Sequence, residues 1–156
     1  MPSQLTNPRG SFDQLAVAGP TGQNVQQYVA SAAIAANTIV ALEYNATTSA
    51  VTVVAAGVGS KNIIGVVERS VAADEIAMVV TAGPAKVRNQ ATTAVIAVGA
   101  HLAAGGTIGA AGCGGIVGFP ATAGARMVGF LLEAVATGDA TGALKQIYVS
   151  TGITPT

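Results

Sequence analysis

Residues 61–83 read KNIIGVVERSVAADEIAMVVTAG and contain two short runs of apolar, largely β-branched residues, NIIGVV at 62–67 and IAMVV at 76–80. Such runs, when they are bounded by polar and turn-forming residues, are typical of buried β-strands. The intervening ERSVAADE carries the charged and turn-forming residues of the stretch. The stretch therefore predicts two strands joined by a polar turn.

Runs of the same kind recur along the chain at a spacing of roughly 8 to 12 residues, as in β-barrels and sandwiches. Alanine is abundant, but no window keeps apolar residues at the i, i+3, i+4, i+7 spacing of an amphipathic helix. We therefore expect an all-β, barrel-like fold. The additional predicted strands lie at 38–42, 50–54, 93–98, 115–119, 126–132 and 146–150.

The chain also contains an internal duplication. IAANTIVAL (34–42) aligns with IAVGAHLAA (96–104), and KNIIGVVERSVA (61–72) aligns with ARMVGFLLEAVA (125–136). One such unit cannot bury its apolar face alone, whereas two units closed on each other share a core and cover strand edges. We predict a β-domain over residues 25–152, built from two similar β-units at about 25–83 and 87–152, and a C-terminal tail at 153–156.

The first 24 residues differ in composition from the rest. Prolines and glycines punctuate this segment and break either periodic pattern before a helix or long strand could form. Its large apolar side chains are scattered among polar ones. We predict that residues 1–24 form an extended N-terminal arm.

Charge excludes several classes of partner. The 7 basic residues cancel the 7 acidic ones, so no long-range field draws in phosphate backbones or anionic membrane surfaces. We expect neither nucleic acid nor membrane as a partner. Because low surface charge promotes association, we expect a homo-oligomer.

Cysteine usage and the N-terminal sequence indicate the compartment. Cys113 is the only cysteine and can form no internal disulfide, which is compatible with a reducing cytoplasm. The N-terminal MPSQLTNPRGSFDQ lacks the basic patch and apolar region of a signal peptide. Two charge-free stretches, 14–42 and 89–125, contain too much Gly, Pro, Gln and Asn to span a bilayer. We expect a protein that is made and kept inside the cell.

Residue types that carry catalysis are few and isolated. His101 is the only histidine, and a lone imidazole makes no metal site. Cys113 lies in a glycine-rich turn without a nearby basic residue to stabilise a reactive thiolate. Glu68, Asp74 and Glu75 are close in sequence but lie outside any calcium-loop pattern. We expect no catalytic residues, no metal and no cofactor, and a protein that binds and stabilises rather than an enzyme.

Four segments, at 38–57, 62–88, 96–109 and 125–149, carry two phrases of the types "vG..l....G.v" and "iG.alea...G....V.V". In these phrases the chain resembles the small capsid cement, or head decoration, proteins of tailed bacteriophages. The resemblance implies a barrel-like or tulip-like β-domain preceded by an extended arm. It also implies a homotrimer on the outside of an icosahedral head, near local three-fold axes, with no catalytic residues to transfer.

We therefore expect a structural virion protein, assembled in the host cytoplasm, that binds the capsid exterior and cements neighbouring subunits of the major capsid protein. Buried apolar side chains and one cation of the arm would fasten it to the shell. The candidate capsid- or subunit-binding residues are Leu5, Arg9, Phe12, Leu15, Val17 and Tyr28.

Two alternatives remain open. The first is another virion surface protein, either a head fibre base or a glycan-binding adhesion module. Glycan binding predicts an exposed aromatic platform, for which three Tyr and three Phe are too scattered in the sequence. The second is a small ligand-binding barrel or enzyme, which predicts a pocket where His101 meets Glu68 or Glu133.

Overall fold

The structure is a computed structural model that describes residues 22–57, 60–89, 95–104, 126–139 and 142–153. Every regular element in these ranges is a β-strand, which confirms the expected all-β class. Among the described residues there is no helix long and apolar enough to cross a membrane. The strands are β1 (Asn24–Ala30), β2 (Thr38–Asn45), β3 (Ala50–Ala55), β4 (Ile63–Val67), β5 (Ile76–Arg88), β6 (His101–Leu102), β7 (Arg126–Leu131) and β8 (Leu144–Ile153).

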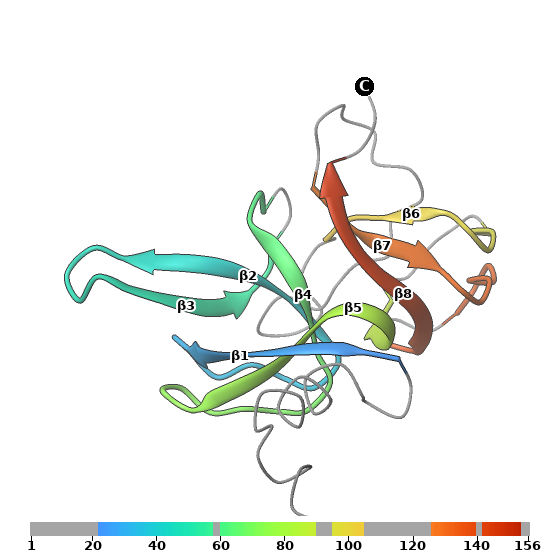
Figure 1. Cartoon of the computed structure of the whole chain (residues 1–156). Coiled ribbons are helices and arrows are strands. Elements are labelled where there is room, and N and C mark those ends of the chain that lie inside the picture. The colour runs from blue at the N-terminus through green and yellow to red at the C-terminus, as the bar shows by residue number, and fades with distance from the viewer. Residues whose placement is uncertain (1–21, 58–59, 90–94, 105–125, 140–141, 154–156) are drawn as a thin grey trace, which may run out of the picture.

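Five strands close into a ring. They follow the order β1-β3-β2-β4-β5, and β1 pairs again with β5 to complete the circuit (Figure 1). The pairs are antiparallel except for β1 and β3, which are parallel and meet at only two register positions, Val29 with Thr52 and Ala30 with Val53. Closure gives each of these strands two neighbours, which confirms the expected barrel-like fold.

Strand β5 belongs to two ladders. Its N-terminal part pairs with β1 and β4, whereas residues 82–88 pair with β8, and the order continues through β7 to β6. In Figure 1 the β2–β3 hairpin lies on one side of β5 and the β6–β7–β8 ladder on the other. We call β1 to β4 with residues 76–81 the first unit, and residues 82–88 with β6 to β8 the second unit.

Two clusters of buried residues hold the units together. One fills the interior of the ring and includes Val40 and Val67, while the other lies where the two units meet and includes Ile39 and Val66. Neighbouring residues of β2 and β4 therefore enter different cores, so both faces of these strands are buried. Burial on both faces explains why the sequence shows continuous apolar runs instead of alternation.

Equivalent positions of the two units make the same backbone contacts. Each unit has one isolated β-bridge. The residue pairing between the last two strands is also the same in the two units. Strand β5 serves as the last strand of the first unit and the first strand of the second. The bridge of Ile34 with Val71 in the first unit corresponds to that of Ile96 with Val135 in the second. In the same way, the pair Val67–Val79 corresponds to Leu131–Ile147. The pair Tyr28–Ala77 corresponds to Val87–Lys145.

Some predicted boundaries differ from the strands observed. Asn24, the last residue assigned to the arm, is the first residue of β1, and Ile153, the first residue of the predicted tail, ends β8. Residues 1–21, 115–119 and 154–156 lie outside the described residues. The described part of the predicted strand at 93–98 makes only the single bridge of Ile96.

Candidate binding surfaces

Five of the six predicted capsid- or subunit-binding residues lie outside the described part of the chain, namely Leu5, Arg9, Phe12, Leu15 and Val17. The sixth, Tyr28, is on β1. Its ring packs against the core inside the ring of strands, and its hydroxyl donates a 2.7 Å hydrogen bond to Oε1 of Gln26. Tyr28 therefore has a structural contact, and its binding of a partner stays a prediction.

The β2–β3 hairpin presents an exposed apolar pair. Tyr44 and Val51 face each other across the two strands and are 64% and 53% exposed. The turn beyond them is ordered by Asn45, whose Oδ1 accepts hydrogen bonds from the backbone N–H groups of Thr47 and Thr48 at 2.9 and 3.2 Å. Because Asn side chains stabilise such turns, the hairpin holds this pair clear of both cores.

A second exposed surface contains two stacked aromatic rings. Phe130 on β7 and Tyr148 on β8 are register partners, with ring centroids 5.3 Å apart and planes 14° from parallel. Tyr148 is exposed, and His101 on β6 is the other cross-strand neighbour of Phe130. The expectation that the aromatic residues are too scattered to gather was wrong for this pair, since strand pairing brings together residues far apart in sequence.

Carboxylates in the first unit hold backbone elements together. Glu68 accepts one hydrogen bond from Nε2 of Gln23 and one from the backbone N–H of Lys86, both at 3.1 Å. Glu75 accepts a 3.1 Å hydrogen bond from the backbone N–H of Ala72. Both side chains therefore fix the ends of strands.

The second unit carries an ion pair in the corresponding turn. Nζ of Lys145 lies 2.8 Å from Oδ2 of Asp139 and 3.6 Å from Oε1 of Glu133. The hydrogen bond from Lys145 lowers the pKa of the Asp139 carboxyl, and the same bond raises the pKa of Lys145. Asp139 also accepts a 2.9 Å hydrogen bond from the backbone N–H of Ala136. This cluster therefore ties β8 to the preceding turn.

The chemical groups considered for catalysis are in these structural contacts or outside the described ranges. Glu68 and Glu133, the predicted partners of His101, make the contacts given above, and Cys113 is outside the described residues. Within the described part of the chain, no three His, Cys, Asp or Glu side chains gather as a metal site requires.

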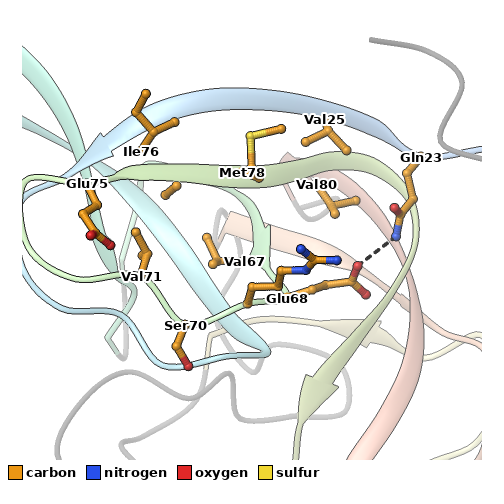
Figure 2. A pocket seen from close by; sticks show the side chains of 12 residues that line it. Gln23, Val25, Val67, Glu68, Ser70, Val71, Glu75, Ile76, Met78 and Val80 are labelled. Carbon is orange, nitrogen blue, oxygen red and sulfur yellow. Dashed lines mark hydrogen bonds between the residues drawn. The ribbon is translucent and has the colours of Figure 1, made fainter. Parts of the chain in front are cut away.

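A cleft of 460 Å³ opens between β5 and the segment that follows β4 (Figure 2). Glu68, Arg69 and Glu75 supply its charged groups, and Gln23 lies at one side with its amide directed at Glu68. We call this the β4–β5 cleft. Its larger apolar lining residues are Val25, Val67, Val71, Ile76, Met78 and Val80.

The sequence gives no signal for this cleft. Ile76 and Met78 lie in a run that predicts a buried strand, yet they are 62% and 50% exposed. They alternate with buried Ala77 and Val79, which face the core inside the ring. The apolar outer face of β5 is therefore a surface that only the tertiary structure identifies.

Comparison with known proteins supplies a structural match. No family model matches the chain, and no curated protein matches it. The fold is similar to that in the crystal structure of the head fiber gp8.5 N base in bacteriophage phi29, with a TM-score of 0.51 and 17% sequence identity. The similarity covers 81% of this chain and 92% of that chain. At this identity the similarity shows a common fold.

Proposed function

We propose that this chain is a structural protein of a bacteriophage virion that binds the outside of the head. The observation that carries the proposal is the fold shared with a phage head fiber base over most of both chains. The pattern resemblance to capsid cement proteins points to the same location independently. Under this proposal the chain acts by binding to the major capsid protein, and it performs no catalysis.

The N-terminal segment supplies the fastening contacts in this proposal. Ordering an extended segment costs about 1–2 kcal/mol per residue, and each large apolar side chain buried in a seam returns about 1.5–3 kcal/mol. Leu5, Phe12, Leu15 and Val17 are the side chains that can provide this burial, and Arg9 can pair with a capsid carboxylate. Tyr28 extends this set onto the β-domain.

Association of three copies strengthens weak contacts in this proposal. Once one arm of a homotrimer is bound, the effective concentration of the others at their sites is high, so avidity replaces single-site affinity. Cementing then follows, because a trimer whose arms contact different capsid subunits resists separation of those subunits.

The location is tested by purifying particles and measuring copy number against the major capsid protein by quantitative mass spectrometry. The proposal expects a number commensurate with the capsid lattice. Absence from the particles would overturn it. Cementing is tested separately, by comparing the temperature of DNA release from heads with and without the bound protein.

The role of the arm is tested with a chain lacking residues 1–21. The deletion stops there because Nε2 of Gln23 donates hydrogen bonds to Glu68 and, at 2.7 Å, to the carbonyl of Pro84. A full-length control with Leu5, Phe12, Leu15 and Val17 changed to Ser separates side-chain contacts from chain length. We expect both variants to lose head binding while their domains melt cooperatively, and unchanged binding would disprove the arm mechanism.

The base of a head fibre is the second candidate, and the structural relative favours it specifically. The two roles differ in their effect on the temperature at which heads release DNA. A cement protein raises this temperature, whereas a fibre base need not. Cryo-electron microscopy of decorated heads separates them further. If the chain is a fibre base, density should project well beyond the β-domain. If it is a cement protein, density should be confined to the surface of the shell.

A further inference from the structure

The two units differ in the contacts between their last strand and the turn before it. In the second unit, the side chain of Lys145 extends from β8 to the preceding turn, where its Nζ lies 2.8 Å from Oδ2 of Asp139 and donates a 3.4 Å hydrogen bond to the carbonyl oxygen of Ala134. Strand register makes Ala77 the equivalent of Lys145, because Ala77 pairs with Tyr28 as Lys145 pairs with Val87. Ala77 is buried and has no polar side chain, so the first unit lacks the contact that Lys145 makes in the second unit.

One acidic group of this turn has an equivalent in the first unit. Glu75 caps its turn through the backbone N–H of Ala72, as Asp139 does through that of Ala136. The cleft thus combines an apolar wall with the carboxylates of Glu68 and Glu75, offset by Arg69. Its apolar wall is suited to a segment with large apolar side chains.

Residues 1–21 contain large apolar side chains and join the domain beside the cleft. They are followed by Gly22 and then by Gln23, which itself lines the cleft. Gly22 has a φ of 72°, a left-handed conformation that lets the chain reverse its direction there. Phe12, Leu15 and Val17 lie within six residues of one another in this segment.

We propose that residues 12–21 fold back into the β4–β5 cleft of their own chain, with Phe12, Leu15 and Val17 against Val25, Ile76 and Met78. The lengths agree. The paired part of β1, Asn24–Val29, spans about 20 Å at roughly 3.3 Å per residue. An extended segment of ten residues reaches at most about 33–36 Å. The segment can therefore run the whole length of the cleft from the turn at Gly22.

This docking goes beyond the proposed attachment to a phage head, because it describes the isolated chain. Phe12, Leu15 and Val17 would have to leave the cleft before they could enter a capsid seam. It also fixes where residues 1–11 leave the domain, at the end of the cleft near Glu75. Leu5 and Arg9 then remain free to contact a neighbouring subunit or a capsid protein. The domain would present a short arm from a defined point.

The test uses Phe12→Trp in the full chain, since the sequence contains no tryptophan. If the segment docks, the indole in the full chain should emit at a shorter wavelength than in a peptide of residues 1–21 with the same substitution. Iodide should also quench its emission less than in the peptide. Met78→Glu and, separately, Ile76→Glu add a charge to exposed positions of the cleft wall. Each should return emission and quenching to those of the peptide.

Tyr44→Glu is the control, because it adds the same charge at an exposed position outside the cleft, on the β2–β3 hairpin, and should leave the emission shifted. Circular dichroism melts check that every variant is folded. Emission equal to that of the peptide, or a shift unaffected by both cleft variants, would overturn the docking. A shift that disappears on dilution would also overturn it, because docking within one chain is independent of concentration. None of these outcomes measures binding to a phage head, so failure of the docking is distinguishable from failure of the proposed function.

Discussion

Gly65 in β4 and Gly129 in β7 face the same obstacle in their two units. A Cβ atom at Gly65 would overlap the carbonyl oxygen of Val80, and a Cβ at Gly129 would overlap that of Tyr148. At both places the neighbouring strand approaches too closely for any side chain. The internal repeat therefore carries a packing requirement as well as a sequence pattern.

Substitution of Gly129 by Ala is expected to destabilise the protein by about 1–3 kcal/mol or more, because the backbones of β7 and β8 must separate. Gly57→Ala is the control, since a Cβ there meets no atom within 4 Å. Urea denaturation followed by circular dichroism measures both. Equal stability of the two variants would show that β8 yields easily at this position.

Leu131 and Leu132 are adjacent, but the first is fully buried and the second is 40% exposed. Leu131→Ala removes apolar contacts in the core between the units and is expected to cost about 2–5 kcal/mol. Leu132→Ala is expected to change the free energy of unfolding far less. A comparable loss in both variants would mean that Leu132 is covered by another part of the chain.

The stacked rings of Phe130 and Tyr148 are expected to stabilise the β7–β8 pair by about 0.5–1.5 kcal/mol beyond the burial of their area. A double-mutant cycle with Phe130→Ala and Tyr148→Ala measures this coupling in urea. Tyr148→Phe keeps the ring and should keep the coupling. A coupling of zero would indicate that the rings only share a surface.

The ion pair of Asp139 and Lys145 predicts a pH dependence of stability. Lys145 lowers the pKa of the Asp139 carboxyl below its ordinary value of 3.8, so the stabilisation is present above that pH and is lost as pH falls through the lowered pKa. The raised pKa of Lys145 gives the opposite limit, with stabilisation present below pH 10.5 and lost as pH rises further. Thermal melts of Asp139→Asn should therefore approach wild-type stability in strong acid. A constant difference between the proteins at every pH would refute the ion pair.

Much of the fold follows from local sequence. The runs NIIGVV and IAMVV lie in β4 and β5, and the repeat predicts that Gly65 and Gly129 are equivalent. The length of β5 was not predictable in this way, because Gly83 and Pro84 normally interrupt strands. They are tolerated where β5 passes from one ladder to the next, and the carbonyl of Pro84 accepts a hydrogen bond from Gln23.

The candidate site was less accessible to sequence reasoning. Tyr28 was identified as a binding residue from its chemistry, but its packing inside the ring depends on closure by β1, whose polar sequence NVQQYVA gives a weak strand signal. The β4–β5 cleft is lined in part by Ala77, whose equivalent in the second unit is Lys145. Aligning the repeats at one constant shift does not pair these residues, since the loop between β7 and β8 is longer than that between β4 and β5.

Strand β5 runs without a break from the ring into the second ladder, and each unit uses part of it. Neither unit can detach its share of this strand without breaking the sheet of the other. A force applied to one unit is therefore transmitted to the other unit through the backbone of β5. Such a molecule is expected to unfold as one body.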